Sequence, residues 1–231
     1  MKEQAEIARD HIINEIITHR ISPGSVLFET VVAERLSMSR TPVRQALNDI
    51  VSMGILEHIK GKRGYALPDL SCSDMYQVLN TRKSIETQAV EEASSLGLSF
   101  EDSNIQAILL LNKKEREAKA VRDRFAFGLI NKDIHFNLVG LSGNIYLARI
   151  FPPIFWRASL YDFHFSTFYN DMITTEEPIY GTPDEHRNIV EAICRGDGEE
   201  AKHCIERHIA PGIERFQKIY ADLQALTKPI R

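Results

Sequence analysis

Hydrophobic and polar positions recur with helical spacing over most of the 231-residue chain. Isoleucines three and four residues apart predict an amphipathic helix over about residues 4–19. A short helix over 30–36 and a third over about 39–53 follow, the third with Ser and Thr residues able to cap its first turn. Two short alternating runs, 55–59 and 65–67, predict a β-hairpin. Helix, helix, tight turn, helix and hairpin is the order of a winged helix-turn-helix.

From residue 73 onward the pattern has a helical period, and no segment alternates with period two. The predicted fold class is therefore mainly α, with an N-terminal winged helix-turn-helix over 1–68 and a C-terminal all-α helical bundle over 73–231. We place the domain boundary in the segment between Pro68 and Ser73. Helices of the second domain are expected at about 73–95, 101–119, 123–141, 145–165, 183–195 and 199–225.

The predicted helix over 39–53 has two chemically different faces at 100° per residue. One face is an apolar stripe that runs from Val43 to Ile50. The other carries arginines, amides and a hydroxyl, which suit the major groove because Arg bonds to guanine and Asn or Gln to adenine. A solvated surface helix is the alternative interpretation. The candidate DNA-binding residues of this helix are Arg40, Thr41, Arg44, Gln45 and Asn48.

The distribution of charge strengthens this interpretation. The whole chain has 28 Lys and Arg against 32 Asp and Glu, a net charge of −4, which by itself disfavours a nucleic-acid partner. Residues 35–63, however, hold six basic side chains against two acidic ones, a net charge of +4. The tip of the hairpin is basic, and wings of this kind reach phosphates or the minor groove of double-stranded DNA. Its candidate contacts are Lys62, Arg63 and Gly64.

Composition excludes several other classes of protein. No run approaches the roughly 18 consecutive apolar residues that a membrane span needs, and the first residues lack the apolar core of a signal peptide. The three cysteines form no CxxC pair, which indicates reduced thiols and no disulfide framework. We therefore expect a cytoplasmic protein with no membrane partner.

Histidines on the later helices form a second candidate site. Asn131 and His135 are four residues apart and are neighbours on one helix face. His186 and His208 are equidistant from residue 197, so the antiparallel arms of a helical hairpin place them at the same height. Three imidazoles and an amide oxygen could thus meet, although a single histidine is more often a core or surface residue. Imidazole ligands favour Zn²⁺ or Ni²⁺ over Mg²⁺ or Ca²⁺.

Residues 21–67, ISPGSVLFETVVAERLSMSRTPVRQALNDIVSMGILEHIKGKRGYAL, resemble the DNA-binding domain of GntR-family bacterial transcription regulators. The PG before an apolar residue, the SRTPVR core, the AL spacing and the GIL before the wing carry the resemblance. It implies that Arg40 and Arg44 read bases or adjacent phosphates, that Thr41 contacts the DNA backbone and that Gly64 lets the wing approach the minor groove.

Two residues of this segment depart from the family pattern. Ser37 stands where the family usually has Gly in the turn. Thr30 stands where some members carry a DNA-contacting Arg. Contacts from the second helix to DNA are therefore left open.

The segments NKDIHFNLVGLSGN and EHRNIVEAICRGDGEEAKHCIERHI resemble the FCD ligand-binding domain of the FadR-type subfamily. In metal-binding members an Asp precedes the first His by four residues, and two later histidines complete the ligand set. The resemblance implies a metal site formed by Asn131, His135, His186 and His208. Because Asn131 replaces a carboxylate with a neutral amide, a bound ion is held less tightly and stays more positive, which favours an anionic effector.

Effectors of FCD domains are typically small organic acids. Arg82 in NTRKSIE occupies a position where the family has a recurrent Arg, and a guanidinium can pair bidentately with a carboxylate. Arg157 and Tyr161 are further candidates for effector binding. An ordinary surface ion pair is the alternative for these residues, and for Arg157 it is the preferred interpretation.

Together these features predict a transcription regulator and not an enzyme. A homodimer would present two winged helices to a palindromic operator, and a small carboxylate effector at a divalent metal, zinc or nickel, would control the affinity for DNA. A metal-dependent enzyme with an accessory DNA-binding domain is one alternative, but the sequence has no HExxH pairing that would supply a general base. The other alternative is a regulator whose histidine cluster is metal-free or purely structural.

Overall fold

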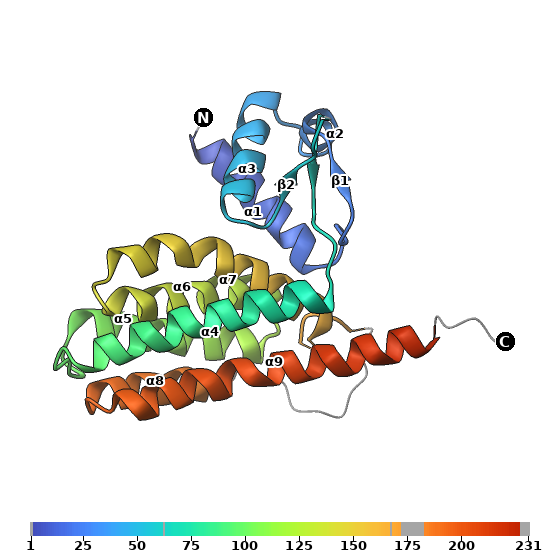
Figure 1. Ribbon diagram of the computed structural model, residues 1–231. Coiled ribbons are helices and arrows are strands. Elements are labelled where there is room, and N and C mark those ends of the chain that lie inside the picture. The colour runs from blue at the N-terminus through green and yellow to red at the C-terminus, as the bar shows by residue number, and fades with distance from the viewer. Residues whose placement is uncertain (1, 62, 167, 172–182, 227–231) are drawn as a thin grey trace. The chain divides into compact units, whose positions relative to one another are not determined.

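The computed structural model describes residues 2–61, 63–166, 168–171 and 183–226 (Figure 1). The chain divides into two compact units, Met1–Ser71 and Cys72–Arg231. Helices dominate both units, which confirms the predicted mainly α fold class. None of the described helices is long and apolar enough to cross a membrane. The first unit contains α1 (Lys2–Ile17), β1 (Val26–Leu27), α2 (Glu29–Arg35), α3 (Arg40–Ser52), β2 (Glu57–His58) and β3 (Tyr65–Ala66).

The core of the first unit forms where α1 packs against α3. Four isoleucines of α1 and the apolar stripe of α3 are almost wholly shielded from solvent, whereas Ile7 of α1 is 52% exposed. Burial of each such side chain contributes about 1.5–3 kcal/mol to folding. This packing leaves the opposite face of α3 in solvent. The buried residues are Ile12, Ile13, Ile16 and Ile17 from α1, and Val43, Ala46, Leu47 and Ile50 from α3.

The hairpin carries a third strand that the sequence pattern did not predict. β1 pairs antiparallel with β3, and β3 pairs antiparallel with β2, so the strand order is β1-β3-β2. With two residues in β1, an alternation of apolar and polar positions cannot be recognised in the sequence. β2 and β3 are also shorter than the predicted runs, at two residues each.

The turn between α2 and α3 places Ser37 in the left-handed region, with φ of +52°. The N–H of Ser37 donates to the carbonyl oxygen of Glu34, and the N–H of Met38 donates to that of Ala33. Helices that end with this pair of hydrogen bonds usually have glycine at the left-handed position, because a Cβ atom is unfavourable there. The family's preference for glycine at this position thus has a backbone cause.

The second unit is a helical bundle built around α4. Figure 1 shows α4 lying between α9 on one side and α6 and α7 on the other, and α4 also packs against α8. α5 packs against α6 and α8. Side chains from α4, α6, α8 and α9 can therefore meet in the interior. The helices are α4 (Cys72–Ser94), α5 (Ser103–Ala120), α6 (Arg124–Leu141), α7 (Ile145–Phe165), α8 (Pro183–Cys194) and α9 (Gly198–Leu226).

Polar side chains cap the starts of α5, α6 and α7. Asp102 accepts from the backbone N–H of Asn104, Asp123 from that of Ala126, and Asn144 from that of Tyr146. Caps of this type contribute about 0.5–2 kcal/mol each because they satisfy N–H groups that have no partner within the helix. They set where each helix begins and hence the height of its functional side chains.

The turn between α8 and α9 brings the two helices back antiparallel. Gly196 has φ of +70°, a backbone conformation that glycine adopts without a steric penalty. The side chain of Asp197 then accepts from the N–H of Glu200 in the first turn of α9. Because α8 and α9 pack along each other after this turn, His186 and His208 come to lie side by side.

Candidate functional site

Three imidazoles from three different helices meet inside the second unit. Nε2 of His135, on α6, lies 3.2 Å from Nε2 of His186, on α8, and 3.1 Å from Nε2 of His208, on α9. The side chains of His135 and His186 are fully buried, and that of His208 is almost so. Nitrogen ligands bind Zn²⁺ at about 2.0–2.1 Å, so ligands of one ion lie about 3–3.4 Å apart. The spacing of the three nitrogens therefore suits one cation.

Each of these imidazoles is hydrogen-bonded through its Nδ1 atom to a glutamate. Nδ1 of His135 lies 2.5 Å from Glu86, Nδ1 of His186 lies 2.8 Å from Glu115, and Nδ1 of His208 lies 2.8 Å from Glu185. With its proton on Nδ1, an imidazole donates to the carboxylate and presents the lone pair of Nε2. Carboxylates orient metal-binding histidines in this way. All three lone pairs can thus point into the same small space.

Sequence reasoning gave none of these three glutamates a place beside the imidazoles. Glu86 follows Arg82 on α4, and Glu115 lies on α5, far along the chain from His186. Glu185 adjoins His186 in sequence but contacts the histidine of the next helix. No local spacing pattern relates these pairs, because each hydrogen bond crosses between helices.

The buried cluster carries excess negative charge. Glu86 and Glu115 are fully buried, and Glu185 is partly exposed. Burial alone would raise the pKa of Glu86, but the adjacent Arg82 and His135 outweigh it and hold that pKa well below its ordinary value. Among the described residues that contact the imidazoles, three carboxylates thus face one guanidinium, that of Arg82. With neutral imidazoles the sum is −2, which a divalent cation would balance.

Burial also determines the protonation of the central imidazole. It lowers the pKa of His135 well below its usual value, with Arg82 and His186 acting in the same direction and Glu86 opposing. His135 is therefore neutral at physiological pH, the form in which an imidazole binds a metal. The donor set fits a transition metal that accepts nitrogen ligands.

Arg82 bridges the cluster and the adjoining space. Its Nε donates to Glu86 at 2.6 Å, and its Nη2 lies 3.0 Å from Nε2 of His135. The guanidinium also lies over the ring of Phe155, with Cζ 4.8 Å from the ring centroid. A lone pair on Nε2 of His135 cannot serve both Nη2 and a cation, so a bound cation competes with this contact.

Asn131, the fourth candidate ligand, lies one turn before His135 on α6. Its Nδ2 donates to Glu115 at 3.4 Å. Within the described part of the chain, Asn131 makes no hydrogen bond to the three imidazoles. An aspartate at this position would place a second carboxylate beside that of Glu115, and the two like charges would repel. The neutral amide of Asn131 avoids this repulsion. Its role as a metal ligand stays a prediction.

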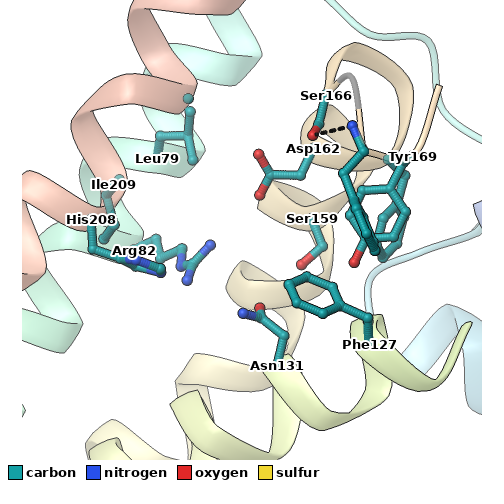
Figure 2. A pocket seen from close by; sticks show the side chains of 14 residues that line it. Leu79, Arg82, Phe127, Asn131, Ser159, Asp162, Ser166, Tyr169, His208 and Ile209 are labelled. Atoms are coloured by element: carbon teal, nitrogen blue, oxygen red, sulfur yellow. Dashed lines mark hydrogen bonds between the residues drawn. The ribbon is translucent and has the colours of Figure 1, made fainter. Parts of the chain in front are cut away.

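A pocket adjoins the histidines and opens to solvent (Figure 2). Arg82, Asn131 and His208 line it beside the cluster. Asp162 and Ser159, both on α7, line the other side. The pocket therefore joins the candidate metal centre to a polar wall. Apolar contact comes from Leu79, Phe127, Phe163, Phe168 and Ile209.

The other two candidates for effector binding lie elsewhere. Nε of Arg157 donates to Asp74 at 2.8 Å, and the hydroxyl of Tyr161 donates to the same carboxylate at 2.6 Å. Neither residue lines the pocket. Arg157 thus forms an ion pair, which is the interpretation that the sequence favoured for it. Asp74 also accepts the hydrogen bond from Tyr161.

In the first unit, the polar face of α3 is exposed as the hydrophobic pattern predicts. All five candidate side chains of this helix lie in solvent. The two amides among them are engaged within the unit, because Gln45 donates to Asp49 at 2.8 Å and Asn48 accepts from the hydroxyl of Tyr65 at 3.1 Å. Contact of these residues with DNA stays a prediction.

A residue that sequence reasoning missed, Glu29 at the start of α2, pairs with both arginines of α3. Arg44 binds it bidentately, with Nε and Nη2 each 2.9 Å from a carboxylate oxygen, and Nη2 of Arg40 lies at 3.3 Å. Hydrogen bonding from Arg44 lowers the pKa of Glu29, with Arg40 adding to the effect and partial burial opposing it. More than half of each arginine side chain remains exposed. Glu29 therefore orients two accessible guanidinium groups.

The wing meets the two arginines across a groove. Arg63, Gly64 and Tyr65 line it together with Arg40 and Arg44. Arg63 is exposed. This arrangement gathers basic side chains from α3 and the wing on one surface.

Gly64 and Lys62 are the other two wing residues that the sequence predicts to contact DNA. Gly64 has φ of +128°, and a Cβ atom there would lie 3.2 Å from the ring of Phe28 and 3.3 Å from a backbone oxygen. Glycine is therefore required by the fold of the wing itself. Lys62 lies outside the described residues, so its predicted contact with DNA cannot be placed.

Family profiles match almost the whole of the chain. The profile described as "Bacterial regulatory proteins, gntR family" matches residues 4–65. The profile described as "FCD domain" matches residues 75–211, which is more than half of the chain.

Relatives of known name are regulators of transcription. The chain is 26% identical over 209 residues to a "Probable D-xylose utilization operon transcriptional repressor" from Paenarthrobacter nicotinovorans, covering 89% of this chain and 85% of the relative. It is 21% identical over 209 residues to the "HTH-type transcriptional repressor GlaR" from Escherichia coli strain K12, covering 90% and 93%. The family and these relatives are transcription regulators, not enzymes.

Solved structures share the fold. "E. coli McbR/YncC" aligns with a TM-score of 0.73 at 18% identity, over 95% of this chain and all of that one. A putative GntR transcriptional regulator from Rhodococcus sp. RHA1 aligns with a TM-score of 0.68 at 16% identity, over 94% and 99%. The sequence resemblance is thereby confirmed, and the chain belongs to the GntR family of bacterial transcription regulators, in the group that carries an FCD domain.

Proposed function

We propose that this regulator binds a palindromic operator as a homodimer, and that a small organic acid held at a metal centre in the second unit controls its affinity for DNA. The single observation that carries the sensing part is the convergence of three Nε2 atoms beside the pocket. The part that binds DNA rests on the family and on the exposed basic surface of α3 and the wing.

The metal we propose is Zn²⁺ or Ni²⁺, held by His135, His186 and His208. Neutral imidazoles suit these ions better than Mg²⁺ or Ca²⁺. Glu86, Glu115 and their hydrogen bonds keep the imidazoles oriented, and their negative charge favours a cation. When bound, the metal supplies a Lewis-acidic position for a carboxylate oxygen.

Arg82 is the second group that we assign to the effector carboxylate. Its guanidinium lines the pocket, and Nη1 makes no hydrogen bond within the described residues. A guanidinium pairs with a carboxylate through two parallel hydrogen bonds, which fixes the orientation of the acid. Arg82 also contacts His135 and Glu86, so a ligand that engages it acts on α4 and α6 together.

On DNA, we assign Arg40 and Arg44 to base edges in the major groove. Both are exposed, and Glu29 holds them close together at the start of α3. Arg63 and the rest of the wing would contact phosphates or the minor groove. Because a dimer with two-fold symmetry repeats these contacts, the operator should be palindromic.

The homodimer is supported by apolar side chains exposed near the start of α7. Tyr146 and Ile150 are four residues apart, hence neighbours on one helix face, and are 70% and 53% exposed. Ile145 beside them is 56% exposed. Clustered exposed apolar residues mark interaction surfaces, and a two-fold dimer buries the same patch of both subunits. Sedimentation of the Ile150→Glu variant as a monomer would support this surface.

Selection of bound sequences from random DNA tests the proposal. We expect an enriched palindrome at moderate salt. On that operator, fluorescence anisotropy with zinc-loaded protein should show a change in affinity of roughly 5- to 150-fold on addition of the effector, the usual range of allosteric coupling. Enrichment of no palindrome, or no response to any carboxylic acid, contradicts it.

One observation favours a second possibility, in which the histidine cluster binds no metal. The contact of Arg82 with Nε2 of His135 gives that lone pair a partner inside the protein. Metal analysis of protein purified without a His-tag separates the two possibilities. About one metal per chain, lost in His135→Ala, supports the metal centre, whereas less than about half, unchanged in that variant, supports a structural cluster.

A further inference from the structure

The pocket beside the histidines has two walls of opposite character. Arg82 approaches from α4, on the side of the imidazoles. Asp162 approaches from α7, and Figure 2 shows the two charged side chains pointing into the pocket from opposite sides. A ligand that places a carboxylate at Arg82 therefore has its other end near a negative charge.

The acidic wall of the pocket is the carboxylate of Asp162. It is only partly exposed, and within the described part of the chain it makes no hydrogen bond or ion pair. Gly212 of α9 lies beside it, such that a Cβ atom there would be 3.6 Å from Oδ1. A carboxylate accepts hydrogen bonds only, and removing it from water without donors is costly. A ligand that fills the pocket must replace the water that serves Asp162.

Two residues with hydroxyl groups, Ser159 and Tyr169, line the pocket together with Asp162. The hydroxyl of Ser159 donates to the backbone oxygen of Phe155 at 2.9 Å, which leaves its lone pairs free to accept. Tyr169 is buried, and burial, together with the charges of Asp162 and Glu115, raises the pKa of its phenol well above the ordinary value. Tyr169 is therefore a neutral donor at physiological pH, and within the described residues its hydroxyl makes no hydrogen bond.

We propose that Asp162 selects the effector, such that the site accepts a monocarboxylate with a hydrogen-bond donor at its other end and rejects dicarboxylates. The inference rests on the proposed function, because it takes Arg82 and the metal centre as the carboxylate site. A hydroxyl or an ammonium group supplies the donor that Asp162 needs. A second carboxylate would face Asp162 as a like charge, and a methyl group would leave its lone pairs without donors.

A hydroxyl suits this wall better than an ammonium group. It can donate to Asp162 and accept from Tyr169 at the same time, whereas an ammonium group has donors only. We therefore expect hydroxy acids to bind more tightly than amino acids of equal length. Either result keeps the requirement for a donor, and their ratio measures the contribution of the Tyr169 hydroxyl.

Four acids of equal length that differ at one end test the inference. Butanoate, 4-hydroxybutanoate, 4-aminobutanoate and succinate form one series, and the corresponding six-carbon acids form a second for a longer reach. Titration calorimetry on the zinc-loaded full chain should give dissociation constants at least about tenfold lower for the hydroxy acid than for butanoate and succinate. This order in the unaltered chain requires no substitution and hence no assumption about folding.

The Asp162→Asn variant provides a second test of the selection by Asp162. An amide removes the negative charge and keeps the shape, so succinate or adipate should bind more tightly while the advantage of the hydroxy acid shrinks. Asp133→Asn, on α6, is the matched control, because its carboxylate is half exposed, pairs with Lys132 and does not line the pocket. This control should keep the wild-type order of affinities.

The possible outcomes distinguish selection by Asp162 from carboxylate sensing itself. If all four acids of a series bind equally, or if Asp162→Asn keeps the wild-type order, the selection by Asp162 is wrong while carboxylate sensing stands. If no acid of either series binds the zinc-loaded chain, carboxylate sensing is itself wrong, and the inference falls with it.

Discussion

Substitution of Glu115 by Gln tests whether a buried carboxylate orients a metal ligand. Glu115 lies 2.8 Å from Nδ1 of His186 and also accepts from Asn112 at 3.2 Å and from Asn131 at 3.4 Å. All three neighbours present donors to it. His186 and Asn112 donate to the same carboxylate oxygen, Oε2, and Asn131 donates to Oε1. In Gln the NH₂ group must face one of these donors, and a neutral amide oxygen accepts more weakly than a carboxylate, so the hydrogen bond that orients His186 is weakened.

The expected loss follows from known effects of carboxylates behind metal-binding histidines. Such substitutions weaken metal binding by about 10- to 100-fold. At zinc equal to 100 times the wild-type dissociation constant, binding stabilises the folded chain by about 2.7 kcal/mol, and this falls to about 1.4 or 0.4 kcal/mol for the variant. At about 3 °C per kcal/mol, the increase of Tm on addition of zinc falls from about 8 °C to between about 1 and 4 °C.

Differential scanning fluorimetry of chelator-treated protein, with and without zinc, measures this change. The control is Glu117→Gln, two residues further along α5, whose side chain is exposed. It should keep the full increase of Tm. If Glu115→Gln keeps it as well, the carboxylate does not orient His186 for a metal. If zinc leaves the Tm of the wild-type chain unchanged, the metal centre itself is refuted.

Three further predictions concern the first unit. Arg40→Ala or Arg44→Ala should weaken binding to the selected operator by roughly 5- to 150-fold, and an equal loss on random DNA would show by anisotropy that the residue contacts phosphate alone. Glu29→Gln removes the acid that pairs with both arginines, so affinity for random DNA should rise and its dependence on salt should steepen, and an unchanged salt slope would contradict this. Ser37→Gly relieves the left-handed strain and should raise the free energy of unfolding by about 0.5–1 kcal/mol in urea titrations, whereas a decrease would refute that reasoning.

The helices were predictable because their cause is local. Apolar side chains at three- and four-residue spacing mark the buried side of each helix. The predicted helix over 145–165 and α7 coincide, and the exposed and buried faces of α3 divide as its sequence pattern indicates. β1 was missed because two residues carry too little pattern.

The sequence by itself determined the order of the helices, the polar face of α3 and the presence of His135, His186 and His208 on helices. Only the tertiary structure decided their partners. Glu115 meets His186 across 71 residues, Glu29 holds Arg44 across 15, and Asp74 occupies Arg157 across 83. Hydrogen-bond spacing along one helix follows from its 3.6-residue period, but contact between helices depends on how each is rotated and shifted in the bundle, which packing of the whole core decides.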